Sequence, residues 1–186
     1  MNRFRLLVLA LVAALLSLAL VSARSYAVAP PVVINEVLAG NATTNMDMTY
    51  TNYSPWVELY NAGGTAVNLG GYRLSDDVAN PAGYALPANT TIPAGGRLIL
   101  WYDEEATGVH TSYSLDVRGD TIALFMADGT LVDSLTFGAQ LVDVAYGRTS
   151  DGAGDWAYFD APTPGAANSG GLALSLIHIS EPTRPY

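Results

Sequence analysis

Alternating apolar and polar residues predict a series of short strands along most of this chain. Val57 and Leu59 alternate with Trp56, Glu58 and Tyr60, which is the period of a strand with one buried face. Similar patterns separated by turn residues occupy 32–38, 56–60, 65–69, 72–75, 84–86, 90–92, 97–102, 113–115, 120–126, 131–137, 144–148 and 156–159. No segment here combines the length, period and caps of a helix. The pattern therefore predicts an all-β sandwich.

The same alternation predicts which side chains fill the core. We expect the core to include Val57, Leu59, Leu74, Leu98, Leu100, Ile122, Leu124 and Leu135. The run 97–102 is the most continuous apolar strand and is expected near the centre of a sheet. Asp128-Gly129 is the strongest hairpin signal in the sequence. The segments 39–54 and 103–112 have no period and are predicted to be exposed loops.

Several motifs, each weak alone, together resemble one known family. They are Ile34-Asn-Glu36, Trp56-Val-Glu-Leu-Tyr-Asn61, the stretch from Val67 to Asp77, the hairpin after Gly119, Tyr146-Gly-Arg148, and Thr163-Pro-Gly-Ala-Ala-Asn168. This order resembles the bacterial lamin-tail domain over a predicted domain 31–168. The resemblance implies an immunoglobulin-like two-sheet β-sandwich. It also implies an accessory role, because such domains accompany others on secreted or surface proteins.

The N-terminal segment has the pattern of an export signal. Arg3 and Arg5 precede an almost unbroken apolar run at 6–21, followed by small residues. We expect a signal peptide at 1–27, cleaved after Ala23 or Ala27, and a secreted or cell-surface protein with no membrane span after cleavage. A membrane anchor is the alternative, but the run is shorter than the roughly 20 residues that span a bilayer comfortably.

The C-terminal segment, 169–186, is predicted to lie outside the fold. Residues 174–184 resemble the translation of a transposon-end sequencing adapter, and they follow the linker-like Asn168-Ser-Gly-Gly171. A natural C-terminal strand is the alternative interpretation. We expect an adapter-derived artefact after a linker remnant, in which case the natural chain continues into a missing C-terminal domain.

The charge of the chain argues against one class of partner, and its lack of cysteine excludes stabilisation by disulfide bonds. Seventeen acidic residues oppose eight basic ones, all arginine, for a net charge of −9. Such a surface repels phosphate backbones, so we expect no nucleic-acid binding. The chain has no cysteine, so its stability must come from packing rather than disulfides.

The sequence offers little for catalysis. His110 is the one histidine before the adapter-like tail, no Gly-x-Ser-x-Gly turn is present, and an ordinary exposed histidine is the expected role. Glu36 and Glu58 could approach across a sheet as a carboxylate pair. The more common role for Asn35, Glu36, Glu58 and Asn61 is structural hydrogen bonding to loop and edge backbone groups. We therefore predict that the domain is not an enzyme.

Two kinds of binding residue remain as candidates. Trp56, Tyr60, Trp101 and Tyr102 can stack on a sugar or protein partner if they are exposed, although aromatics of this kind usually pack in the core. The weak calcium candidates are Asp76, Asp77, Asp103, Glu104, Glu105, Asp151 and Asp155, none with EF-hand spacing. Acidic loops are more often simply solvated, so no cofactor is expected.

The sequence thus predicts a non-catalytic exported binding or display module whose protein or carbohydrate partner is unknown. One alternative is the targeting module of an exported hydrolase whose catalytic domain is missing beyond Gly171. A second is a calcium-stabilised adhesin module.

Overall fold

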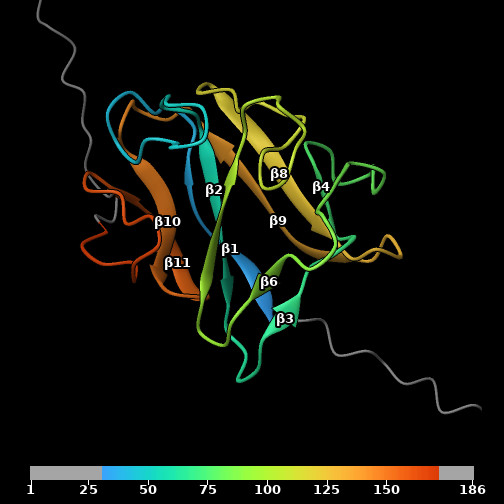
Figure 1. The fold of residues 1–186 in the computed structure, drawn as a ribbon. Coiled ribbons are helices and arrows are strands. Elements are labelled where there is room, and N and C mark those ends of the chain that lie inside the picture. The colour runs from blue at the N-terminus through green and yellow to red at the C-terminus, as the bar shows by residue number, and fades with distance from the viewer. Residues whose placement is uncertain (1–30, 172–186) are drawn as a thin grey trace, which may run out of the picture.

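The computed structural model describes residues 31–171, which form eleven strands (Figure 1). The strands are β1 (Val32–Leu38), β2 (Trp56–Asn61), β3 (Val67–Asn68), β4 (Arg73–Ser75), β5 (Tyr84–Ala85), β6 (Thr91–Ile92), β7 (Arg97–Trp101), β8 (Gly119–Phe125), β9 (Leu131–Gly138), β10 (Ala145–Ser150) and β11 (Ala153–Phe159). No helix occurs within this range. The all-β prediction is confirmed.

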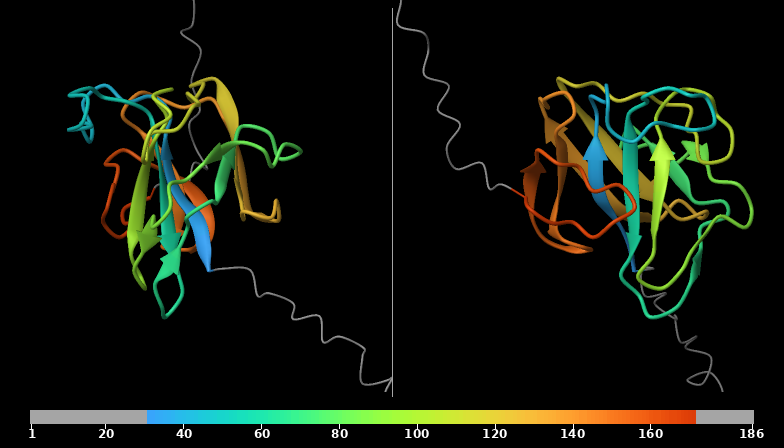
Figure 2. Two further views of the ribbon diagram at one scale, coloured as in Figure 1. Left: turned by 45° about the vertical axis from the view of Figure 1, so that its right-hand side comes forward. Right: turned by 60° about the vertical axis from the view of Figure 1, so that its left-hand side comes forward.

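Two antiparallel sheets form the layers of a sandwich (Figure 2). The five-stranded sheet has the order β11-β10-β1-β2-β7, and the four-stranded sheet has the order β5-β4-β8-β9. The short strands β3 and β6 pair separately at one end. The predicted strand at 113–115 is absent. The predicted strands at 144–148 and 156–159 are longer in the structure, where β10 and β11 pair as a tight hairpin.

The core lies between the two sheets, as the alternation predicted. Val57 and Leu59 of β2 pack in the same apolar cluster as Leu74 of β4 and Leu124 of β8. The other predicted core residues belong to this cluster too, with Leu98 only partly buried. Burying each such side chain contributes roughly 1.5–3 kcal/mol relative to leaving it in water.

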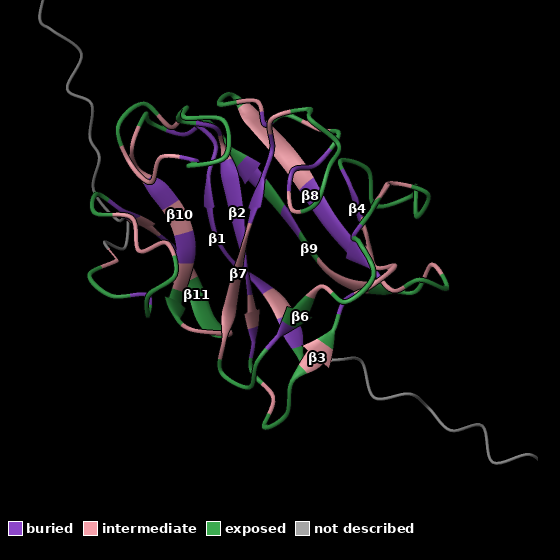
Figure 3. Cartoon of the chain, viewed as in Figure 1, coloured by how far each residue is buried: buried purple, intermediate pink, exposed green. Residues whose placement is uncertain are grey.

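The outer face of the five-stranded sheet is also buried, which the sequence did not predict. β1 and β2 are buried over almost their whole length, so both of their faces are covered (Figure 3). A second apolar cluster on this face holds Leu38, Trp56, Trp101, Ala145, Ala157 and Phe159. The segment 160–171 runs across the face and hydrogen-bonds to β1 and β2 through Thr163, Gly165 and Asn168 (Figure 2).

Burial overturns the predicted role of three aromatic residues in partner binding. Trp56 is fully buried and Trp101 is 9% exposed, both in the outer cluster. Tyr102 is 1% exposed and belongs to the core between the sheets. Tyr60 is half-buried, and the Arg97 guanidinium lies 5.0 Å from its ring centroid. Trp56, Trp101 and Tyr102 therefore cannot stack on a partner.

A β-bulge in β1 sets which residues face outward. The pairing with β2 shifts between Ile34 and Glu36, so Asn35 has no partner of its own on β2. The Ile34 backbone amide donates to Asp133 Oδ2 at 2.9 Å, and its carbonyl accepts from Arg148 Nε at 2.9 Å. The bulge thus lets Asn35 and Glu36 both reach polar groups on the outer face.

Two predictions concern residues outside the described range. The signal peptide at 1–27 lies before residue 31, and the adapter-like part of 169–186 lies after residue 171. Within 31–171 no helix has the length and apolar character needed to cross a membrane.

Candidate functional site

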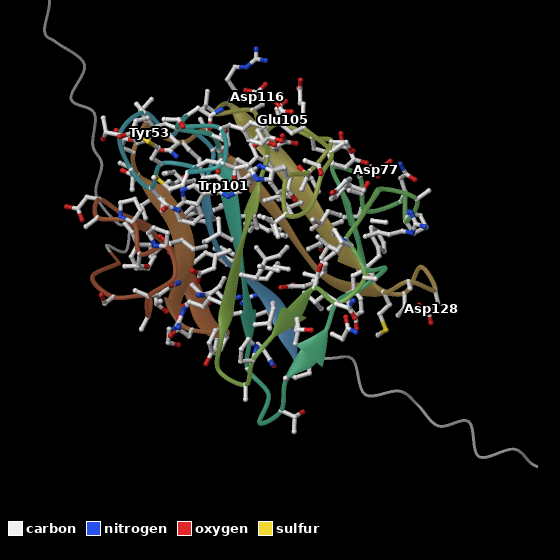
Figure 4. All side chains as sticks on the ribbon, in the orientation of Figure 1. Tyr53, Asp77, Trp101, Glu105, Asp116 and Asp128 are labelled. Carbon is white, nitrogen blue, oxygen red and sulfur yellow. The ribbon has the colours of Figure 1, made fainter. Side chains whose placement is uncertain are left out.

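Two long loops meet at one end of the sandwich, which we call the loop end. The first, 39–55, joins β1 to β2, and the second, 102–118, joins β7 to β8 (Figure 1). The Tyr102 amide donates to the Pro55 carbonyl at 2.9 Å and holds the loops together at their bases. Tyr53, Glu105 and Asp116 lie at this end, whereas Asp128 lies far from it (Figure 4).

The loops bring two carboxylates and an imidazole together, a group we call the Asp-Asp-His cluster: Asp47, Asp103 and His110. One ligand atom from each lies within 4.8 Å of the others. His110 Nδ1 lies 2.7 Å from Asp103 Oδ2 and 3.7 Å from Asp47 Oδ2. All three side chains are almost fully buried, so this cluster of ionisable groups is held in an environment of low polarity.

Backbone hydrogen bonds place His110 beside Asp103. Thr107 and His110 exchange two hydrogen bonds at 3.0 Å, which close a tight turn. Trp101 then donates its amide to the Val109 carbonyl and accepts from the Thr111 amide, so the turn folds back onto the end of β7. His110 is only 4% exposed, and the prediction of an ordinary exposed histidine is wrong.

Asp47 is positioned by its own loop. Its amide donates to the Asn52 carbonyl at 2.8 Å, and its Oδ1 accepts from the Thr49 amide at 2.8 Å. Its Oδ2 is buried and has no hydrogen-bond partner among residues 31–171. The edge of the Tyr50 ring contacts the His110 ring, with centroids 4.9 Å apart.

Beside this cluster lies an open depression of about 590 Å³, which we call the acidic hollow. Its lining consists of Asp76, Glu104, Ser112, Tyr113, Ser114, Leu115, Asp116, Val117 and Asp120. The four carboxylates in this lining face no lining cation. Arg118 lies next to the hollow, and its hydrogen bonds to Asp116 lower the pKa of that carboxyl to about 2. Asp116 therefore stays ionised over the ordinary pH range, but Arg118 neutralises its charge. Asp76, Glu104 and Asp120 are the lining carboxylates that form no ion pair within residues 31–171.

A second group of polar and ionisable residues lies on the covered face of the five-stranded sheet, and we call it the buried polar network. It comprises Asn35, Glu36, Glu58, Arg97, Asp151 and Asn168. Glu36 and Glu58 are direct cross-strand partners, as the sequence suggested. The Asn35 amide group donates to Glu58, Asp151 and Asn168 at 2.9 to 3.1 Å, and its Oδ1 accepts from the Gly152 amide.

Every carboxylate oxygen of the glutamate pair is occupied. Glu36 accepts from the amide and the hydroxyl of Thr163. Glu58 accepts from Asn35 and from the Gly165 amide at 2.7 Å. Burial is the main cause that raises the pKa of Glu58, to about 7, and that also raises the pKa of Glu36. The pair thus links β1 and β2 to segment 160–171 through hydrogen bonds.

Arg97 and Asp151 complete the network, and Gly147 makes room for it. Arg97 forms an ion pair with Asp151 and lies 3.5 Å from Glu58. A Cβ at Gly147 would lie 3.1 Å from both Asn168 and Glu36, so this position favours glycine. Asn61 lies outside the network, and its side chain donates to the carbonyls of residues 65, 92 and 93.

The structure divides the seven calcium candidates among different environments. Asp103 is in the Asp-Asp-His cluster, Asp76 and Glu104 line the acidic hollow, and Asp151 is tied into the buried polar network. Asp77, Glu105 and Asp155 are exposed and belong to none of these groups. The candidates therefore do not converge on one calcium site.

Asp47 is the site residue that sequence reasoning missed. It lies in a loop with no period, and His110 follows it by more than sixty positions. The only available signal was compositional: an acidic residue in one long loop and the lone internal histidine in another. The conformation of the loops decides which of these residues come into contact. The hydrophobic period of a sequence carries no information about that conformation.

Comparison with known families agrees with the fold. The family model for the Lamin Tail Domain matches residues 26–139, which is more than half of the chain. A comparison with curated proteins found no match. The matched range contains β1 to β9 and both loops of the loop end. The chain therefore belongs to the lamin tail domain family, a non-catalytic family with an immunoglobulin-like fold.

Proposed function

We propose that this domain is an exported, non-catalytic binding module whose loop end binds a cationic segment of a protein partner. The observation that carries the proposal is the acidic hollow. Asp76, Glu104, Asp116 and Asp120 line one open depression, and no basic side chain lines it. A concave surface of one charge concentrates ligands of the opposite charge and speeds their association.

The chemistry of the hollow supports a basic partner over a phosphate-bearing one. The hollow has the same sign of charge as a nucleic-acid backbone or an anionic lipid surface, so either would be repelled. Lysine and arginine side chains would instead form charge-assisted hydrogen bonds with Asp76, Glu104 and Asp120, the lining carboxylates not paired with Arg118. Loops on a rigid sandwich are a common place for recognition, because the scaffold holds them in position.

A non-catalytic role agrees with how the domain uses its ionisable groups. The glutamate pair is fully hydrogen-bonded under segment 160–171, and hydrolysis by a carboxylate pair would need open access. His110 pairs with carboxylates inside the loop end rather than with a nucleophile. Export is proposed from the signal-like N-terminal segment, whose charged start and apolar run are typical of secretory signals.

The test is binding of a fluorescent lysine-rich peptide to the purified chain, measured by anisotropy at about 0.05 and about 0.2 M salt. We expect saturable binding that weakens at the higher salt. A glutamate-rich peptide of equal length is the matched control and should not bind. Retention on DNA or anionic vesicles, without binding of the lysine-rich peptide, would contradict the proposal.

A further inference from the structure

The Asp-Asp-His cluster carries an inference that goes beyond the proposed binding of a basic segment. We propose that Asp47, Asp103 and His110 form a binding site for a divalent transition-metal ion of the zinc type, which links loop 39–55 to loop 102–118. The inference stands on geometry, burial and donor chemistry, and it does not depend on what the acidic hollow binds.

The geometry brings three donor atoms from both loops to one point. His110 Nδ1 lies 2.7 Å from Asp103 Oδ2 and 3.7 Å from Asp47 Oδ2, and all three donor atoms lie within 4.8 Å of one another. A tetrahedral zinc ion with bonds of about 2.0–2.2 Å separates its ligand atoms by roughly 3.3–3.5 Å. The two distances from His110 Nδ1 lie on either side of that value, and the two carboxylates lie no more than 4.8 Å apart, so side-chain rotations would have to bring all three atoms to this spacing.

Asp47 provides an independent reason to expect a cation. Its Oδ2 is buried, has no hydrogen-bond partner within 31–171, and faces the imidazole. A buried carboxylate oxygen without a partner is costly, and proteins normally pair it or use it to bind a metal. The Oδ1 atom of the same carboxylate is held by the Thr49 amide, which fixes the orientation of the side chain. The free oxygen is thus held toward the cluster by its own loop.

The donor set favours a zinc-type ion over calcium. Calcium takes six to eight oxygen ligands, whereas this cluster supplies one imidazole nitrogen with two carboxylates. Imidazole suits zinc and neighbouring transition metals, and three protein ligands leave one position of a tetrahedron open. Tyr50 is 39% exposed and its ring edge meets His110, so the cluster lies close beneath the surface.

The competing interpretation is that protonated His110 itself serves as the cation for both aspartates. In that arrangement His110 donates to Asp103, and the charge of the imidazolium offsets Asp47 at 3.7 Å. Zinc binding would require the imidazole Nδ1 to be unprotonated. Titration with a metal therefore separates the two interpretations.

The first experiment is calorimetric titration of the chelator-treated full chain with zinc chloride at pH 7.5. We expect one zinc ion per chain, and at least about a tenfold loss of affinity in Asp47→Asn and in Asp103→Asn. Asp155→Asn, at an exposed position outside the cluster and the hollow, and His178→Gln, at the other histidine of the chain, are matched controls that should leave the affinity unchanged. Calcium chloride should give no saturable binding.

A second measurement needs no change in the cluster, and so remains valid if an Asp variant fails to fold. In the ¹⁵N-labelled His178→Gln chain, zinc should shift the Nδ1 resonance of His110 in the imidazole spectrum. Absence of saturable zinc binding would overturn the proposal. So would zinc binding that leaves the His110 Nδ1 resonance unchanged, or binding that is lost in His178→Gln and retained in Asp47→Asn.

Discussion

The buried polar network and the loop end use the same kinds of side chain in opposite ways. In the network, the oxygens of Glu36 and Glu58 accept hydrogen bonds from Asn35, Thr163 and Gly165. In the loop end, Asp47 leaves a buried oxygen unpaired, and the acidic hollow opens to solvent. Carboxylates whose oxygens all accept hydrogen bonds from the protein stabilise its fold. A carboxylate with an unpaired oxygen can still bind a ligand. In our proposal, this difference separates the residues that hold the fold together from those that bind a partner.

The network also explains how segment 160–171 is held on the sheet. Its contacts with β1 and β2 include hydrogen bonds to Glu36, Glu58 and the backbone of Asn35. A buried ion pair or carboxylate is weak evidence for net stability, but removal of one partner leaves an uncompensated charge. Loss of a single network member should therefore cost far more than loss of a residue in the loop end.

The largest expected effect is that of Asn35→Ala. This change removes the donor to Glu58, Asp151 and Asn168 and the acceptor for the Gly152 amide. We expect the free energy of unfolding in urea to fall by roughly 3–5 kcal/mol. Asn68→Ala is the matched control, because Asn68 is exposed and bonds only the Gly70 amide; it should cost under about 1 kcal/mol. Equal losses in the two variants would show that the network contributes no more to stability than the exposed hydrogen bond of Asn68.

The next effect is a dependence of stability on pH. Burial raises the pKa of Glu58 from 4.5 to about 7, so the folded chain holds this proton more tightly than the unfolded chain. The stabilisation is complete below pH 4.5 and is lost as the pH rises to about 7, with a total on the order of 3 kcal/mol. Urea unfolding at several pH values should show this decline. In Glu58→Gln the decline should be smaller, and the part that remains is expected from Glu36, whose pKa burial also raises. An unchanged decline would mean that a group other than Glu58 causes it.

A smaller effect is expected for Thr163→Val, which keeps the shape of the side chain. The change removes the hydroxyl that donates to Glu36 Oε2 at 2.8 Å, while the backbone bond from residue 163 remains. We expect a loss of about 1.5–3 kcal/mol, which is typical of a hydrogen bond to a charged group. Thr121→Val is the control, because its exposed hydroxyl bonds only Thr136 across the strands. A loss no larger than in the control would indicate that segment 160–171 is held by other contacts.

The fold could be predicted from sequence where the signal was local. Alternation at Val57 and Leu59 identified the face of β2 that meets the opposite sheet, and Leu100 and Leu124 followed the same period. Turn residues marked most of the strand ends. The proximity of Glu36 and Glu58 was also accessible, because β1 and β2 are neighbours in sequence and pair directly.

The predictions that failed depended on contacts distant in sequence. Trp56 was a reasonable exposed aromatic on the pattern of β2 alone, but segment 160–171 and Val109 cover its face of the sheet. Asp47 and His110 meet because two irregular loops fold onto each other, and neither loop has a period. Nothing in residues 39–54 indicated which side chain would turn inward. The arrangement of side chains at the loop end could therefore be learned only from the structure.

The most direct test of the account concerns the acidic hollow. The double variant Asp76→Asn/Glu104→Gln removes two lining charges, and both residues are exposed. Asp128→Asn/Asp155→Asn removes the same charge at exposed positions outside the hollow. We expect both variants to unfold within about 0.5 kcal/mol of the parent chain.

The deciding measurement is the affinity of these two variants for the lysine-rich peptide at about 0.05 M salt. We expect the hollow variant to bind about tenfold or more weakly than the parent chain, because each lost charge pair contributes on the order of 1 kcal/mol. The charge-matched control should lose no more than about twofold, through its net charge alone. Equal weakening in the two variants would show that the peptide responds to overall charge, and would contradict the claim that the loop end is a binding site.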